Sequence, residues 1–219
     1  MAVLHGIGDS RLGSAGFAPL FVAEGYTVLL PDSRAHGSSG GAIVTYGVLE
    51  KYDILQWAEW MRKQGCARSY GLGESLGAAV LIEAAAIRPA FLAIAAECSF
   101  ADLPSMGQYR VARMSHLPDS LTALLSPILV KGVLLYTRIR YGVDLNQGSP
   151  LTSIARATIP VLLIHGLEDV STPVEHSRRL ARANPAAVLW LVPGAGHVGA
   201  FAAAPQEFRE RLRAWFAIR

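Results

Sequence analysis

The sequence is poor in cysteine and in charge. Its 219 residues include 2 cysteines, Cys66 and Cys98, and only 17% are charged. Two cysteines cannot build a disulfide framework, so they favour a reducing, cytoplasmic setting. The net charge is +3, and the arginines are scattered or follow helical spacing. This pattern is typical of solvated helix faces and argues against nucleic acid as a partner.

Long apolar runs and a secretion signal are also missing. The longest charge-free apolar run, 121–130, contains Pro127 and ends before Lys131. A membrane span needs ~20 apolar residues, so we expect no stable membrane insertion. The first residues show no basic segment followed by an apolar core and a cleavage site, which agrees with a cytoplasmic protein.

The sequence offers no pattern for a cofactor. No group of Cys, His and Asp has the spacing of metal ligands. Gly6, Gly8 and Gly13 are followed by no acidic residue at the place that a dinucleotide fingerprint requires. We therefore predict neither a metal nor a cofactor.

Short runs of Val, Leu and Ile alternate with longer segments of helical period. Such alternation is typical of an α/β fold, a mostly parallel sheet with helices on both faces. The predicted strands are residues 2–4, 26–30, 68–71, 92–96, 161–165 and 188–192. The predicted helices are residues 16–24, 48–64, 75–87, 173–183 and 205–218. In the helix 48–64, apolar spacing predicts a buried face made of Leu49, Tyr52, Leu55, Trp57, Ala58 and Met61.

One long segment, 100–159, interrupts the alternation. It shows no convincing strand but contains helix-compatible apolar pieces at 121–125 and 128–136. A structureless loop of that length is improbable in a compact domain. We therefore predict a helical cap over 100–159, inserted between two parts of one core, 1–99 and 160–219.

The most informative motif is Gly73-Glu74-Ser75-Leu76-Gly77, which follows a short apolar run. The pattern Gly-x-Ser-x-Gly is typical of a nucleophile elbow, where a strand turns sharply into a helix with the serine at the apex. Glycines two residues either side leave no Cβ to collide where strand and helix crowd together. The amide of Leu76 would then lie at a helix N-terminus, where it can stabilise an oxyanion.

A serine hydroxyl needs a base, and the base needs an acid to orient it. Asp169 follows the predicted strand 161–165, and catalytic groups lie at that carboxyl edge of a parallel sheet. His197 lies in the glycine-rich loop after the strand 188–192 and is the only histidine beyond that strand. The chain order Ser75, Asp169, His197 matches the α/β-hydrolase template.

With these residues the chain resembles the α/β-hydrolase superfamily, most closely its prolyl-oligopeptidase-like and serine-aminopeptidase-like serine esterases. Residues 3–8, Val-Leu-His-Gly-Ile-Gly, resemble the turn that supplies the second oxyanion amide, which by position belongs to Ile7. Residues 31–40 resemble the family's Asp-x-Arg-Gly-His-Gly-x-Ser loop, with Ala35 where glycine is usual. The family position His-Gly-x-x-Asp favours Asp169 over its neighbour Glu168 as the acid.

The remaining polar candidates have structural interpretations. We expect His5, His36 and His165 to bond loop backbone beside the site. Glu74 would orient neighbouring loops, and the two remaining histidines, His116 and His176, would lie at the surface.

The resemblance implies a Ser-His-Asp carboxylic ester hydrolase that forms an acyl-enzyme on Ser75. Within the predicted cap, uncharged side chains offer an apolar lining, which favours esters of short to medium acyl chains as small-molecule substrates. These side chains are Leu121, Leu124, Leu125, Ile128, Leu129, Val133, Leu134 and Tyr136. A thioesterase, a peptidase, a perhydrolase and a slow hydrolase-like binding protein remain alternatives.

The resemblance also implies a departure from the family at the start of the chain. Family members have two antiparallel strands before the strand that ends in His-Gly, whereas Met1 lies only four residues before His5. These N-terminal strands are therefore missing, which would leave the strand 26–30 with an unpaired edge. An apolar edge without lysine or proline recruits partners, so we predict a homodimer through it.

Overall fold

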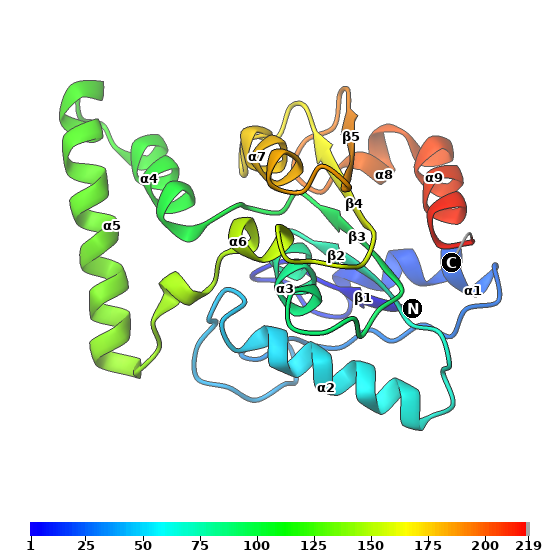
Figure 1. Cartoon of the computed structure of the whole chain (residues 1–219). Coiled ribbons are helices and arrows are strands. Elements are labelled where there is room, and N and C mark those ends of the chain that lie inside the picture. The colour runs from blue at the N-terminus through cyan, green and yellow to red at the C-terminus, as the bar shows by residue number, and fades with distance from the viewer. Residues whose placement is uncertain (218–219) are drawn as a thin grey trace.

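The computed structural model describes residues 1–217, whose centre is a five-stranded, entirely parallel sheet in the order β1-β2-β3-β4-β5. The strands are β1 (Ala2–Leu4), β2 (Tyr70–Glu74), β3 (Ala93–Glu97), β4 (Val161–Gly166) and β5 (Val188–Val192). The predicted fold class, a mostly parallel sheet with helices, is confirmed. Since all strands run the same way, their carboxyl ends share one edge of the sheet. The segments that follow β2, β3, β4 and β5 begin at this edge (Figure 1).

Helices follow the strands as the alternation predicts. They are η1 (Gly13–Phe17), α1 (Ala18–Val22), α2 (Glu50–Lys63), α3 (Leu76–Ala85), α4 (Leu103–Met114), α5 (Asp119–Tyr141), η2 (Leu145–Gln147), α6 (Pro150–Ile154), α7 (Glu175–Ala183), α8 (Ala200–Ala203) and α9 (Pro205–Ala217). The predicted end of the last helix, Ile218, lies outside the described residues.

The sheet has an apolar core on each face. Alternate residues of a strand point to opposite faces, and in β4 Leu163 joins one core while Leu162 and Ile164 join the other. The first core lies under α2, α3, α6 and α7, and the second under α1, α8 and α9. The sheet is therefore a rigid, doubly covered platform for the loops at its edge.

The predicted strand 26–30 is not a strand. It touches the sheet through a single bridge, in which Leu29 accepts from Val3 N at 2.9 Å and donates to Met1 O at 2.8 Å. The ladder stops there because β1 is only three residues long, and within residues 1–217 no strand pairs with the other side of this segment. The homodimer through this edge stays a prediction.

β2 begins and ends later than predicted, at Tyr70 and Glu74 instead of 68 and 71. The sequence pattern stopped at Gly71 because glycine weakens strands. In the structure the strand runs through Gly71 and Gly73 because α3 lies directly on it: a Cβ on Gly71 would come within 2.8 Å of Leu81.

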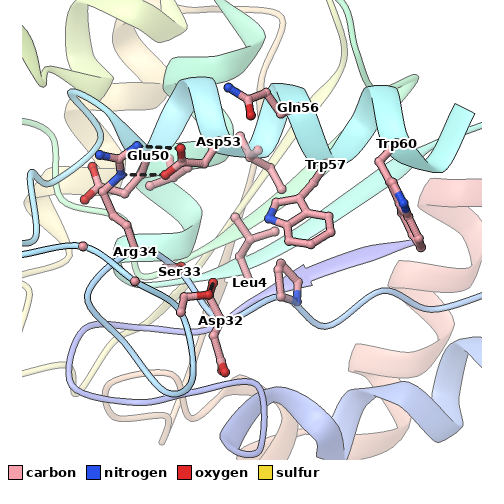
Figure 2. Close-up of a pocket in the computed structure, with 15 residues that line it drawn as sticks. Leu4, Asp32, Ser33, Arg34, Glu50, Asp53, Gln56, Trp57 and Trp60 are labelled. Carbon is pink, nitrogen blue, oxygen red and sulfur yellow. Dashed lines mark hydrogen bonds and ion pairs between the residues drawn. The ribbon is translucent and has the colours of Figure 1, made fainter. Parts of the chain in front are cut away.

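The buried face of α2 differs in part from the prediction. Leu55, Ala58 and Met61 are buried as expected, but Tyr52 and Trp57 are exposed, and Ile54 takes a core position instead. The rings of Trp57 and Trp60 project from α2 toward the loop 31–41 (Figure 2). The apolar spacing assigned Tyr52 and Trp57 to the buried face because aromatic side chains count as apolar, although both lie at the edge of that face.

Residues 100–159 contain α4, α5, η2 and α6 and no strand, and α4 with α5 stands beyond the sheet at the opposite end from α9 (Figure 1). α5 packs on α4 and buries only a narrow stripe, Thr122, Ser126, Val130 and Leu134. Large apolar side chains such as Leu124, Ile128 and Ile139 face outward.

α5 also corrects an expectation about length. It has 23 residues, and an 18-residue window within it has a mean hydropathy of 1.5, so by length and composition alone it could cross a membrane. The apolar run 121–130 predicts no membrane span because it contains Pro127 and ends before Lys131, but the helix continues through both residues. A cap helix that packs on its neighbour meets the same criteria, so these properties assign no membrane role.

The packing predicts different costs for the same substitution at two sites. Leu81→Ala, in the fully buried part of α3, should lower the free energy of unfolding by about 2 to 5 kcal/mol because it leaves a cavity. Leu124→Ala, on the outer face of α5, should change it by less than about 0.5 kcal/mol. Urea denaturation followed by circular dichroism measures both, and equal losses would contradict this assignment of the core.

Candidate active site

Ser75 lies at the sharp turn between β2 and α3. Its backbone is in a sparsely populated region, with φ 51° and ψ −106°. The turn is possible because its two glycines have no side chain: a Cβ on Gly73 would lie 2.5 Å from the backbone of Gly77, and one on Gly77 would lie 2.5 Å from Leu4 O. The elbow predicted from the sequence is thus a close three-way contact of β1, β2 and α3.

Ser75, His197 and Asp169 form one hydrogen-bonded line, although they come from distant parts of the chain. His197 Nε2 lies 3.0 Å from Ser75 Oγ, and His197 Nδ1 lies 2.7 Å from Asp169 Oδ2. A carboxylate can only accept, so Nδ1 carries the proton and Nε2 is left to accept from the serine hydroxyl. This is the arrangement that a base needs to activate a hydroxyl nucleophile.

The carboxyl of Asp169 is fully satisfied. Its Oδ1 accepts from the amides of Ser171 and Thr172, each at 2.8 Å, and its Oδ2 faces His197 and, at 3.3 Å, His165 Nε2. Burial alone would raise the pKa of Asp169, but the hydrogen bonds from His165, His197 and Thr172 outweigh it and lower the pKa well below its usual range. Asp169 is therefore an anion that orients the imidazole. Its neighbour Glu168 is exposed and makes none of these contacts.

Residue 97 fixes both the serine and the histidine loop. The carbonyl of Glu97 accepts from Ser75 N at 2.8 Å, and its side chain accepts from Ala200 N at 2.9 Å. Cys98 Sγ accepts from Val198 N at 3.3 Å, one residue beyond His197. Both Cys98 and Val198 have positive φ, 54° each, so this loop is bent tightly against β3.

Two further residues predicted for the site line the same cavity as Ser75. Ile7 and Leu76 line it, and within residues 1–217 neither N–H donates to another protein group. Two histidines brace the turn that bears Ile7: His5 Nε2 accepts from Ser33 N at 3.0 Å, and His36 Nε2 accepts from Gly8 N at 3.2 Å. The structure thus brings together all five residues predicted for the site.

A cavity of about 490 Å³ opens beside Ser75, between the core and the α4–α5 pair. Most of its wall is apolar: Ile7, Leu76, Phe100, Leu103, Met106, Val111, Leu129, Val130, Val133, Leu134 and Leu145. Of the predicted lining, Leu129, Val133 and Leu134 reach the cavity. Leu121, Leu124, Leu125, Ile128 and Tyr136 do not, because α5 turns only one narrow face inward.

A second cavity, about 580 Å³, lies between the loop 31–41 and α2, and none of Ser75, Asp169 and His197 lines it. Its charged groups already satisfy one another: Arg34 binds Asp53 through two bonds of 2.5 and 2.6 Å, as Figure 2 shows, and Glu50 accepts from the amides of Thr45 and Gly47. This cavity holds no nucleophile with a base beside it, so the candidate site is the cavity at Ser75.

The other histidines divide between prediction and correction. His165 is buried, with Nε2 2.8 Å from Thr172 O, and His116 is exposed, as predicted. His176 was predicted at the surface but is buried, because its Nδ1 accepts from Ala101 N at 3.1 Å and ties α7 to the end of β3. Burial lowers the pKa of His176 to about 4, so it is a neutral structural residue.

One cluster has the composition of a metal site. Ligand atoms of Cys98, His165 and Asp169 lie within 4.8 Å of one another, and all three residues are buried. A metal would need the thiolate, yet burial raises the pKa of the Cys98 thiol far above its usual range. The oxygens of Asp169 are already occupied by donors, so the cluster fits a structural network better than a cation.

Sequence analysis missed three residues of this region: Tyr46, Glu97 and Arg110. Tyr46 and Arg110 line the cavity, and Glu97 links β3 to the histidine loop. None belongs to a motif or to a periodic apolar stripe, and each reaches the site only through the packing of distant segments.

Comparisons with known proteins agree with this geometry. A family model described as "Alpha/beta hydrolase family" matches residues 2–211. "Uncharacterized protein YqkD" of Bacillus subtilis (strain 168) is 31% identical over 182 residues, which make up 81% of this chain and 57% of that protein. The chain thus spans just over half the length of this relative.

Solved structures give the same picture. The Pyrococcus furiosus esterase Pf2001 is similar with a TM-score of 0.76 and 25% identity over 99% of this chain and 81% of its own. A Paleococcus ferrophilus monoacylglycerol lipase shares the fold, with a TM-score of 0.66 and 22% identity over 98% of this chain and 92% of its own.

The crowding at the elbow predicts opposite effects for two glycine substitutions. Gly77→Ala should lower the free energy of unfolding by about 3 kcal/mol or more, because the new methyl group collides with the backbone of Leu4. Gly132→Ala, in α5 with no atom within 4 Å of a new Cβ, should raise it by up to about 1 kcal/mol. Urea denaturation decides, and a stable Gly77→Ala protein would contradict the three-way contact.

Glu97 predicts a pH dependence of stability. Burial raises its pKa from 4.5 to about 7, and its Oε2 has no hydrogen-bond partner among the described residues. Between pH 4.5 and 7 the unfolded chain loses this proton while the folded chain keeps it, so folding becomes less favourable as pH rises, by on the order of 3 kcal/mol. Glu97→Gln should remove this part of the decline.

The measurement compares urea midpoints at pH 5 and pH 8. The wild type should lose more stability over this window than Glu97→Gln, while Glu210→Gln, on the exposed side of α9, controls for the loss of one negative charge. Identical pH dependences for wild type and Glu97→Gln would mean that Glu97 is ionised in the folded protein throughout this range.

Proposed function

We propose that this chain, which belongs to the alpha/beta hydrolase family, hydrolyses carboxylic esters of short to medium acyl chains through an acyl-enzyme on Ser75. One observation supports this above the others: the unbroken line from Ser75 Oγ to His197 to Asp169, at 3.0 and 2.7 Å, at the mouth of an apolar cavity.

In the proposed reaction, Ser75 Oγ attacks the acyl carbonyl while His197 Nε2 accepts its proton. Asp169 holds the imidazole by Nδ1 and stabilises the positive charge that the ring acquires. The carbonyl oxygen becomes an oxyanion, which the free amides of Ile7 and Leu76 would bind. His197 then protonates the leaving alcohol, and water, activated by the same histidine, releases the acid and restores Ser75.

The cavity supports an ester with an acyl chain. Methylene groups gain up to ~0.8 kcal/mol each when buried against an apolar wall, and most residues lining this cavity are apolar. The similar Pyrococcus furiosus protein is an esterase, which supports the same substrate class. Thioesters, peptides and peracid formation use the same catalytic line, so the test includes them as competing substrates.

The hydrogen-bonded line of Ser75, His197 and Asp169 predicts that these three residues act as one unit in catalysis. Ser75→Ala, His197→Ala and Asp169→Asn should each lower kcat for 4-nitrophenyl butyrate by about 10³-fold or more, with normal circular dichroism, because each removes the activation of the same nucleophile. Spectrophotometric release of 4-nitrophenol measures the rates.

Glu168→Gln is the matched control, since it changes the exposed carboxylate next to Asp169 and should keep wild-type activity. Activity that survives Ser75→Ala would overturn the acyl-enzyme. A wild-type protein that binds esters without turnover would instead be a slow ligand-binding protein, and faster turnover of a butyryl thioester or peptide would replace esters as the substrate class.

A further inference from the structure

The wall of the Ser75 cavity contains one charged side chain. Arg110, an exposed residue of α4, lines the cavity beside apolar residues such as Met106 and Val111. Within residues 1–217 no carboxylate pairs with its guanidinium, whereas Arg113, one turn later, is bonded to Val170 O and Tyr109 Oη. A guanidinium presents parallel N–H donors that match a carboxylate, and here these donors are free.

Tyr46 faces the same cavity from the opposite segment of the chain, the loop before α2. Its φ of 51° is an uncommon conformation for a tyrosine. Glu50 imposes this conformation, because it accepts from Thr45 N at 2.6 Å and from Gly47 N at 2.8 Å on either side of Tyr46. Backbone strain that the surroundings enforce is typical of residues presented to a ligand.

Both side chains line the same cavity. The Tyr46 ring packs edge-on against Phe100, with centroids 6.4 Å apart, and within the described residues its hydroxyl makes no hydrogen bond. Burial raises the pKa of Tyr46, and the positive charge of Arg110 acts against this rise. The cavity therefore has a cation and a free O–H donor in a lining that is mostly apolar.

We propose that Arg110 and Tyr46 bind a carboxylate at the far end of the acyl chain, which makes monoesters of short dicarboxylic acids the preferred substrates. This inference rests on the proposed function, since it assumes that the ester carbonyl lies at Ser75. The methylene groups between the two ends would lie along the apolar wall. The carboxylate would accept from the guanidinium and from Tyr46 Oη, replacing the water that it loses on entry.

The experiment compares monoethyl adipate with ethyl hexanoate, a neutral ester of the same acyl length, by pH-stat titration. In the wild type, kcat/KM should be higher for monoethyl adipate. Arg110→Met should lower the ratio of the two kcat/KM values about tenfold, through KM, because it removes a charge-assisted contact made equally in the ground and transition states. Tyr46→Phe should lower the ratio about fivefold.

Lys131→Met is the matched control, because Lys131 is an exposed cap cation outside the cavity, and both rates should stay at wild-type values. Added 0.5 M NaCl should reduce the adipate preference of the wild type but not that of Arg110→Met. A ratio within twofold of wild type in Arg110→Met, or a wild type that prefers ethyl hexanoate, would overturn the proposal.

A binding measurement separates this proposal from the proposed function. Calorimetric titration of Ser75→Ala with monoethyl adipate needs no turnover, and adding Arg110→Met should weaken binding about tenfold. Binding that depends on Arg110 in a wild-type protein without esterase activity would keep the carboxylate site and reject the esterase. An affinity for monoethyl adipate that Arg110→Met leaves unchanged would overturn the proposed carboxylate site.

Discussion

A close steric contact joins the start of α3 to β1 and β2. Gly73 and Gly77 allow it, because a methyl group on either would lie 2.5 Å from backbone atoms. The contact lifts Ser75 above the sheet edge in its uncommon conformation and starts α3 with an unpaired amide at Leu76. The core follows from the same contact, since Gly71 lets Leu81 lie directly on the sheet. Nucleophile, amide and core thus share one steric cause.

The carboxyl groups around the elbow differ in pKa according to the number of hydrogen bonds that each accepts. Asp169 receives four donors and stays ionised. Among the described residues, the side chain of Glu97 accepts one hydrogen bond, from Ala200 N, and that of Glu74 accepts one, from Ser14 Oγ. Burial therefore raises the pKa of both glutamates to about 7. The difference is one of hydrogen bonding, because all three lie at the same edge of the sheet. Asp169 thus supplies the negative charge at His197 Nδ1 that an imidazole acting as a general base requires.

Sequence reasoning predicted what local patterns determine. Five strands, the long helices and the residues Ser75, Asp169 and His197 follow from motifs and from apolar alternation, and the structure brings these residues together. It failed where a neighbour distant in the chain decides. The segment 26–30 has strand composition but too short a partner in β1, His176 is drawn inward by Ala101, and α5 turns Leu124 and Ile128 outward. Tyr46 and Arg110 were missed because a cavity wall assembled from two distant segments has no signature in either.

The position of residue 97 determines how precisely the nucleophile and the base are placed relative to each other. Its carbonyl fixes Ser75 and its side chain fixes the loop that carries His197, so the separation of nucleophile and base is set through one residue of a central strand. None of Ser75, His197 and Asp169 lies in α4 or α5. α4 reaches the loop of the acid instead, because Val170 O accepts from Tyr109 Oη at 2.7 Å and from Arg113 Nη1 at 3.0 Å. A shift of α4 would therefore act first on the residue next to Asp169, while the spacing of nucleophile and base is held from β3.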